Sequence, residues 1–178
     1  MIQVNPPTPS RVRGARASAP AWCRRVAQVA LAMRRLLLGL TAAFAVSATG
    51  QTGPQPKLRT MDLRAGMHVI KAELAVTPEQ QATGMMFRKE MNGNEGMLFV
   101  NEEKGLRCFW MRNTLVPLTI AFIDDDGSIV NLADMQPLDE RSHCSVRPVR
   151  FALEMPQGWF ARRGIQAGFK LRGQPFGS

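Results

Sequence analysis

Residues 118–135 read LTIAFIDDDGSIVNLADM, and this stretch decides the fold class. Residues 118–123 and 128–135 are rich in apolar and β-branched side chains, as strands are. Between them, Asp124-Asp125-Asp126-Gly127 has the composition of a tight turn, because aspartate and glycine tolerate the backbone angles that such turns require. The stretch therefore predicts a β-hairpin.

Similar segments lie on both sides of this hairpin. The other strand candidates are residues 68–76, 96–100, 106–114, 149–155 and 169–171. In residues 149–155, apolar side chains alternate with Arg150, Ala152 and Glu154, which predicts a strand with one buried face. The turn-rich residues 91–95 and the charged residues 101–105 are expected to be turns.

One short helix is expected after Thr77. Thr77-Pro78-Glu79-Gln80 offers an N-cap hydroxyl, a proline at the first helical position and a glutamine at the capping-box place. Gly84 is suited to close this helix in the left-handed conformation, and a short helical piece is expected at residues 159–163. We therefore expect a mainly β domain, either a small β-sandwich or a partly open barrel, with about six to seven strands and one short helix.

Residues 33–48, MRRLLLGLTAAFAVSA, have the pattern of a signal peptide. Arg34 and Arg35 precede an apolar stretch, and small residues at Val46 and Ala48 predict cleavage near Ala48. The apolar stretch is 13 residues long, whereas a membrane-spanning helix needs about 20, so an uncleaved anchor is the weaker alternative. We expect an exported, periplasmic protein, and the arginine pair leaves the general and twin-arginine routes open.

The rest of the chain divides by composition. Residues 1–32 are rich in Pro, Arg and Ala without a periodic pattern, and we expect a non-native or disordered extension, with translation starting at Met33. Residues 49–60 are expected to be a linker, residues 61–173 a single β-rich domain, and residues 174–178 a tail.

The charge distribution argues against a nucleic-acid partner. The chain carries 23 basic and 14 acidic residues, a net charge of +9, but residues 1–48 hold seven arginines and no acidic residue. The remaining 16 basic and 14 acidic residues give residues 49–178 a net charge of only +2, too small for phosphate binding to be the first expectation. With His68 and His143 as the only histidines, and no phosphate-loop or dinucleotide motif, we expect neither metal nor cofactor.

Two cysteines are candidates for a disulfide. Cys23 lies ahead of the expected cleavage site, which leaves Cys108 and Cys144 in the exported domain. An oxidising compartment favours a bond between them. The alternative is that Cys108, beside Phe109 and Trp110, is a buried thiol.

Five strings carry a resemblance to a known family. They are GMMFR (84–88), EGMLF (95–99), FWMRNT (109–114, followed by Pro117-Leu118), AFIDDDGSIV (121–130) and FALEMPQGW (151–159). In order and spacing, over residues 62–172, the chain resembles the domain of unknown function family numbered 192. The resemblance implies a small, mainly β sandwich, commonly preceded by a signal peptide, with no established activity. Many members carry an acid where this chain has Thr119, so a catalytic role that depends on that acid would be absent here.

The family-like strings also hold the candidate site residues, which are Arg88, Glu95, Trp110, Arg112, Asn113 and Glu154. An arginine beside a tryptophan binds carboxylates or sugars, and in a strand Trp110, Arg112 and Thr114 would share one face. The alternative is structural, with Trp110 in the core and Asn113 in a turn. Likewise, Arg88 and Arg112 with Glu95 and Glu154 form either a ligand site or a structural ion-pair network.

These features favour an accessory module of the cell envelope that binds a small polar or saccharide-like ligand or a partner protein. Two alternatives remain: a hydrolase with Glu95 or Glu154 as general acid or base, and a purely structural envelope protein. Convergence of Arg88, Glu95, Arg112 and Glu154 on a concave surface would favour binding, and a carboxyl with a raised pKa there would favour the enzyme.

Overall fold

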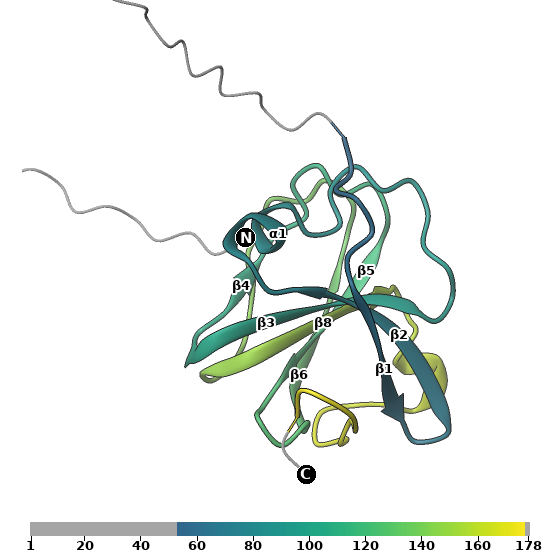
Figure 1. The fold of residues 1–178 in the computed structure, drawn as a ribbon, viewed down its shortest axis with the longest axis vertical. Helices are drawn as coiled ribbons and strands as arrows, with labels where there is room; N and C mark the ends of the chain where they lie inside the picture. Colours follow the sequence, from purple (N-terminus) through teal and green to yellow (C-terminus); the bar gives the residue numbers. More distant parts are fainter. Residues whose placement is uncertain (1–52, 177–178) are drawn as a thin grey trace, which may run out of the picture. The chain divides into compact units, whose positions relative to one another are not determined.

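The computed structural model describes residues 53–176, and it shows a six-stranded sheet at the centre of the domain (Figure 1). In spatial order its strands are β1 (Thr60–Ala65), β2 (His68–Ala75), β3 (Glu95–Gly105), β8 (Val149–Pro156), β5 (Leu118–Ile123) and β6 (Ile129–Met135). Neighbours pair antiparallel except β2 and β3, which are parallel. A second sheet joins β4 (Cys108–Phe109) to β7 (His143–Cys144).

The expectation of a mainly β domain is confirmed, with eight strands among the described residues. The expected extension, signal peptide and cleavage site within residues 1–48 lie outside the described part of the chain. Between residues 53 and 176, no helix is long and apolar enough to cross a membrane.

Two local predictions are confirmed because short-range hydrogen bonds determine them. In the hairpin between β5 and β6, the Asp124 amide donates to the Ser128 carbonyl at 2.9 Å. In front of α1 (Pro78–Thr83), the Thr77 hydroxyl and the Gln80 side chain form the expected capping box.

The end of α1 differs from the prediction. Gly84 does have a positive φ of 50°, but its ψ of −130° is not left-handed helical. The expected piece near residue 160 is the turn η1 (Ala161–Arg163).

Three strand and turn predictions are wrong. Of residues 106–114, only β4 is a strand, because Asn113 has a φ of 55° and the Met111 amide bonds to a distant loop at the Asp139 carbonyl. Trp110, Arg112 and Thr114 therefore do not share a strand face. Residues 101–105 extend β3 past an irregular register instead of forming a turn, and residues 169–171 make single bridges only.

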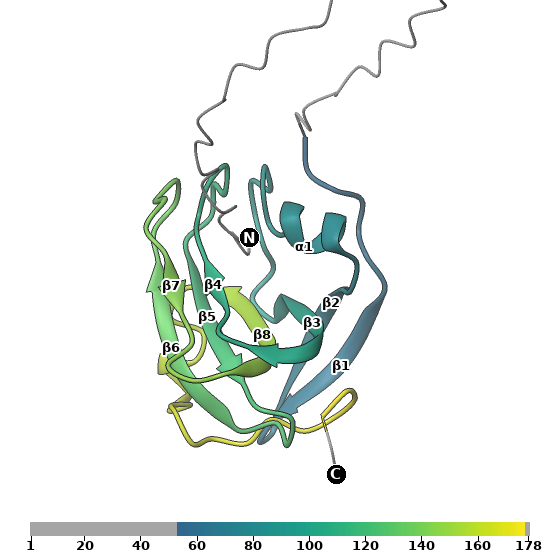
Figure 2. The same ribbon diagram turned by 90° about the vertical axis from the view of Figure 1, so that its left-hand side faces the viewer.

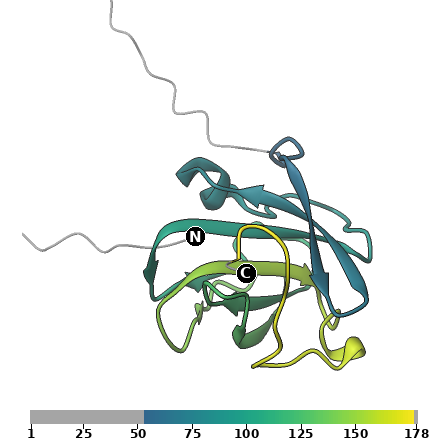
Figure 3. The same ribbon diagram turned by 60° about the horizontal axis from the view of Figure 1, so that its bottom comes forward.

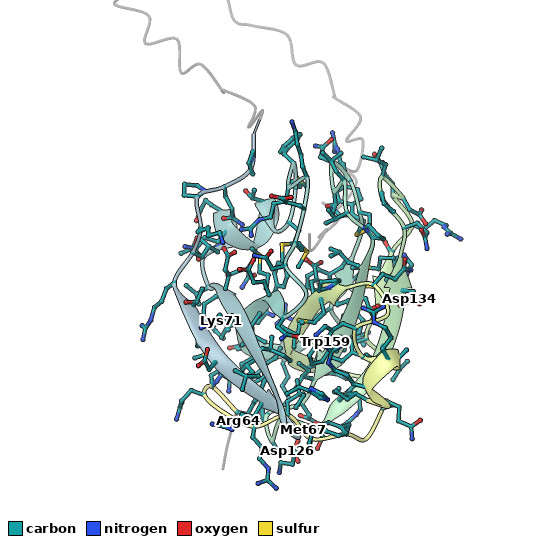
Figure 4. All side chains as sticks on the ribbon, turned by 90° about the vertical axis from the view of Figure 1, so that its right-hand side faces the viewer. Arg64, Met67, Lys71, Asp126, Asp134 and Trp159 are labelled. Atoms are coloured by element: carbon teal, nitrogen blue, oxygen red, sulfur yellow. A yellow bond between two sulfur atoms is a disulfide. The ribbon has the colours of Figure 1, made fainter. Side chains whose placement is uncertain are left out.

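Both faces of the sheet are buried at the central strand β8, so the half-buried pattern expected for this strand is also wrong. β8 lies between β3 and β5, and Ala152 and Glu154 are as inaccessible as Leu153 on the other face. The segment after β8 covers one face, where Trp159 lies near its middle (Figure 4). Figure 3 shows that this segment then crosses the sheet, and it forms bridges at Ser128 and at Arg64.

The opposite face carries α1 and the loops around β4 (Figure 2). On this face, the strand register places Glu73 opposite Met97 and Met97 opposite Glu154. Paired residues on neighbouring strands lie about 5 Å apart, so the two glutamates stand about 10 Å apart in one row across the sheet. This row forms the floor of the candidate site.

Candidate functional site

Glu73 is held at one end of this row by a buried ion pair. Its carboxylate accepts hydrogen bonds from Arg88 Nη1 at 2.6 Å, from Arg88 Nη2 at 2.8 Å and from the Leu58 amide at 2.9 Å. Burial acts to raise the pKa of Glu73, but the hydrogen bonds from Arg88 and Leu58 outweigh it and the pKa is lowered. Glu73 and Arg88 therefore form a charged pair with two parallel hydrogen bonds at neutral pH.

The turn after α1 brings Arg88 back over the sheet. Phe87 has a φ of 62°, and its amide donates to the Asn113 carbonyl at 2.8 Å. Asn113 has a positive φ as well, so two strained turns meet at this hydrogen bond. The GMMFR string thus reverses the chain, and Arg88 points back toward β2.

A cavity of about 420 Å³ opens beside Arg88. Its polar lining comes from Gln55, Lys57, Glu73, Arg88, Lys89, Glu90, Asn92 and Glu95, and its apolar lining from Pro54, Met85, Phe87, Met91 and Gly96. Lys57 Nζ lies 3.7 Å from a Glu95 oxygen, and both side chains are in contact with solvent. The cavity thus combines a buried ion pair, a partly exposed carboxylate and an apolar wall.

The segment ahead of β1 forms part of the cavity wall. The Gln55 side-chain amide donates to the carbonyls of Gln80 and Gly84, at 3.1 and 2.9 Å, and the Leu58 amide reaches Glu73. Residues 53–59, expected to belong to a linker, are therefore held against the domain by hydrogen bonds.

Glu154 occupies the other end of the row in a different environment. Its side chain is buried, with 4% of the residue exposed. Burial raises the pKa of Glu154 to about 7, although the charge of Arg88 acts in the opposite direction. Within residues 53–176, no hydrogen bond or ion pair reaches its carboxylate, and it lines a narrow cleft next to the cavity.

The candidate residues are distributed unequally over these two spaces. Arg88 and Glu95 line the cavity, and Trp110 and Glu154 line the narrow cleft, with Met85 in both linings. Arg112 lines neither space. It is exposed, and its guanidinium carbon lies 5.7 Å from the Trp110 ring centroid.

Asn113 also lines neither space, and its contribution is the turn and the carbonyl that receives the Phe87 amide. Sequence reasoning missed Glu73 as a site residue. Its only sequence signal is a charge within an apolar strand, and its partner Arg88 lies 15 residues away.

Cys108 and Cys144 form a disulfide, as one of the two sequence hypotheses held. The bond joins β4 to β7, where the two cysteines are paired in register. It therefore ties the loop that carries Trp110 to the loop that precedes β8. No group of three or more His, Cys, Asp or Glu side chains able to hold a metal occurs among residues 53–176.

The Thr119 departure lies away from this site. Thr119 is in β5 next to Ile120, and Ile120 is the residue that pairs with Glu154. Neighbouring strand residues point to opposite faces, so Thr119 lies on the other side of the sheet. There its hydroxyl donates to Asp134 at 2.5 Å and accepts the Gly158 amide at 3.0 Å.

A comparison with known families matches the region that contains the family-like strings around Arg88, Glu95, Trp110 and Glu154. The sequence profile of the family DUF192, described as "Uncharacterized ACR", matches residues 61–173. The chain belongs to this family. No curated protein matches the sequence.

Two solved structures are similar to this DUF192 chain in sequence and in fold. A protein from Sinorhizobium meliloti described as a "putative transcription regulator" is 34% identical, with a TM-score of 0.64 over 67% of this chain and 97% of that one. A protein of unknown function from Novosphingobium aromaticivorans is 35% identical, with a TM-score of 0.63 over 70% of this chain and 94% of that one. Both identities exceed 30%, so the likeness extends beyond the fold to sequence.

Proposed function

We propose that this DUF192 domain is an exported module of the cell envelope that binds a small polar ligand in the cavity beside Arg88. The observation that carries this proposal is the cavity of about 420 Å³ with mixed polar and apolar walls. Its volume lies within the range of about 300 to 1,000 Å³ that is usual for small-molecule sites. The leader and the disulfide support export, because disulfides persist in oxidising compartments.

The ion pair between Arg88 and Glu73 inside the cavity bears on the chemistry of the ligand. Both terminal nitrogens of Arg88 already bind Glu73, so its charge is neutralised and an anionic ligand is not required. Glu95 is only weakly paired and accepts hydrogen bonds from ligand hydroxyls, while Met85, Phe87 and Met91 offer an apolar wall. Sugars present both hydroxyls and an apolar ring face, so we favour a saccharide-like ligand.

A DNA-binding role, which the description of the Sinorhizobium protein suggests, is less well supported. Residues 49–178 carry 16 basic and 14 acidic residues, a net charge of +2. Sequence-independent contact with DNA depends on clusters of Lys and Arg that neutralise phosphates. In this domain many of the basic side chains are paired with acids, as at Lys104 and Asp124.

An enzyme is the second candidate, because the pKa of Glu154 is raised to about 7. A carboxyl that titrates near neutral pH is suited to general acid or base catalysis. Hydrolysis of glycosides, however, usually needs two carboxyl groups on either side of the same bond. Glu73 is held by Arg88, and Glu95 lines the cavity and not the cleft of Glu154. Assay of nitrophenyl esters and glycosides with the protein and with Glu154→Gln tests this candidate, and equal rates for both would exclude it.

Thermal unfolding in the presence of a defined panel tests ligand binding. The panel contains glucose, N-acetylglucosamine, glycerol and L-glutamate, because a ligand that binds only the folded state raises Tm. Met91→Trp fills the cavity, and the matched control Leu106→Trp adds the same ring at an exposed position outside its lining. We expect a sugar to raise the Tm of the protein and of the control, but not of Met91→Trp.

Two results would contradict the cavity as the binding site. The first is an equal rise in Tm for the protein and for Met91→Trp. The second is the absence of any rise with the whole panel at concentrations of about 10 mM, where ligands of even weak affinity bind.

A further inference from the structure

A second cavity lies on the face of the sheet opposite Glu154. Its volume is about 260 Å³, enough for about eight groups the size of a water molecule, each of which takes ~30 Å³ in the liquid. The cavity lies between the outermost strand β6 and residues 160–165, which follow β8. No residue lines both this cavity and the cavity beside Arg88, so the two spaces are separate.

Most of the lining of this second cavity is apolar. It comes from Leu132 and Ala133 on β6 and from Phe160, Ala161 and Ile165 around the turn η1. Phe160 and Ile165 belong to the buried core of this face, and Leu132 packs against that core. The Ile165 amide donates to the Phe160 carbonyl at 3.1 Å, which closes the turn. The walls are therefore held in place by the core and offer an apolar surface to a ligand.

Thr119 and Asp134 are the polar residues of the lining, and they pair across β5 and β6. The buried Thr119 hydroxyl accepts the Gly158 amide at 3.0 Å and donates to Asp134 Oδ1 at 2.5 Å. Asp134 is exposed and lies near the edge of the sheet (Figure 4). Thr119 therefore orients the Asp134 carboxylate, and in the described part of the chain no hydrogen bond occupies its second oxygen, Oδ2.

The cations nearest in sequence to the cavity do not neutralise Asp134. In the described part of the chain, no ion pair reaches its carboxylate. The two arginines of η1 bond to other groups. Arg162 Nη1 donates to the Gln157 carbonyl at 3.2 Å, and Arg163 Nη1 donates to the Trp159 carbonyl at 3.1 Å. The lining thus contains one oriented negative charge and no basic side chain.

A ligand that complements this cavity combines a positive charge with an apolar body. Hydrogen bonds from an ammonium to a carboxylate are assisted by charge, and contact with the apolar walls removes hydrocarbon from water. Ca²⁺ and Mg²⁺ require several oxygen ligands, whereas Asp134 is the only carboxylate in the lining. An anionic ligand would be repelled by Asp134.

We propose that this second cavity binds a small primary amine with an apolar body, whose ammonium donates to Asp134 Oδ2 while its hydrocarbon part contacts Leu132 and Phe160. The chemical class is that of arylalkylamines and branched alkylamines. The site lies on the other face of the sheet from the cavity beside Arg88, and its occupation does not depend on what that cavity binds.

Benzylamine is a probe with this chemistry, and its about eight non-hydrogen atoms fit the volume of the cavity. Benzyl alcohol has the same ring without the charge, and methylamine has the charge without the ring. In NMR titrations of the purified protein, we expect benzylamine to cause a saturable shift of the Gly158 amide resonance. This amide bonds to the hydroxyl that holds Asp134, so it reports on the carboxylate.

The two control compounds should bind more weakly than benzylamine. We expect benzyl alcohol to bind about fivefold more weakly, because ion pairs at exposed carboxylates contribute modestly to affinity. Methylamine should bind more weakly still, because it removes little apolar surface from water.

Asp134→Asn tests the charge of the site. Asparagine keeps an oxygen that accepts the Thr119 hydroxyl, so we expect the fold to be retained and the affinity for benzylamine to fall about fivefold, to that for benzyl alcohol. The matched control is Asp62→Asn, an exposed position on β1 outside the lining, for which we expect unchanged affinity.

Ala161→Trp tests the space itself. Ala161 is exposed at the start of η1 and lines the cavity, so a tryptophan there fills the cavity without entering the core. We expect the saturable shift with benzylamine to be lost. Ala167→Trp adds the same ring at an exposed position outside the lining, and it should leave the affinity unchanged.

Four results would overturn the amine site. They are equal affinities for benzylamine and benzyl alcohol, unchanged affinity in Asp134→Asn, unchanged affinity in Ala161→Trp, or no saturable shift of the Gly158 resonance up to about 50 mM benzylamine. None of them bears on the cavity beside Arg88, which the sugar panel and Met91→Trp test separately.

Discussion

Glu73 and Glu154 occupy the same row on one face of the sheet, yet they differ in what surrounds their carboxylates. Glu73 accepts three hydrogen bonds and its pKa is lowered, whereas Glu154 has no donor within residues 53–176 and its pKa is raised. The strings around Arg88 and Glu154 pointed to both residues. Glu73 was missed because its role comes from a tertiary contact that leaves no local pattern in the sequence.

Arg88→Met should destabilise the protein. The substitution leaves the Glu73 carboxylate buried without its cation, which costs on the order of 3 kcal/mol. Urea unfolding measures the change, with Arg112→Met at an exposed position as the control. We expect the control to differ from the protein by less than about 0.5 kcal/mol, and an equal loss in both variants would refute a special role for the ion pair.

Glu154→Gln should change how stability depends on pH. Glu154 has a higher pKa when folded, about 7 against an ordinary value of 4.5, so the folded state binds the extra proton between these values. Protonated Glu154 therefore contributes stability that is fully present below pH 4.5 and is lost as the pH rises through about 7. The free energy of unfolding should fall by on the order of 3 kcal/mol over this range. Comparison of urea unfolding at pH 5 and pH 8 measures this loss.

The variant should lack this part of the pH dependence, because glutamine does not titrate. Glu102→Gln, at an exposed position, should retain it. If the protein and Glu154→Gln lost the same free energy of unfolding between the two pH values, Glu154 would not titrate in this range.

At the level of strands and turns, the sequence was informative where local hydrogen bonds decide the structure. The hairpin after β5 and the capping box of α1 were predicted, because their turn and cap residues act within a few positions. Residues 106–114 were misread as a strand. Met111 lies in a loop but is fully buried in the core on the face of the sheet that carries Glu154, and such tertiary burial leaves no strand or helix period in the sequence.

The close packing of β3 on β8 also gives a prediction. A Cβ on Gly96 would lie 2.7 Å from the Glu154 carbonyl oxygen, whereas a Cβ on Gly93 would meet nothing within 4 Å. Gly96→Ala should therefore destabilise the protein by about 2 kcal/mol through overpacking. Gly93→Ala is the control, and equal unfolding midpoints for the two variants would show that the strands do not approach this closely.

At the level of the whole molecule, residues 1–48 are strongly basic, whereas residues 49–178 are nearly neutral. The sequence predicted the family and the mainly β class, left the disulfide as one of two alternatives, and supplied four of the residues that line the cavity beside Arg88 and the cleft of Glu154. It did not predict the cavity, because residues 53–58, the turn after α1 and the start of β3 meet only in the folded chain. Concavity is a property of the assembled domain and not of any one segment.

The most direct test of ligand binding is a high-resolution crystal structure of the protein purified from its native cells and soaked with the sugar that raises its Tm most. We predict density for the sugar in the cavity, with a hydroxyl within hydrogen-bond distance of Glu95 and the ring against Met91. A cavity that holds only ordered water, in crystals where Met91 and Glu95 face open solvent channels, would contradict the proposed function.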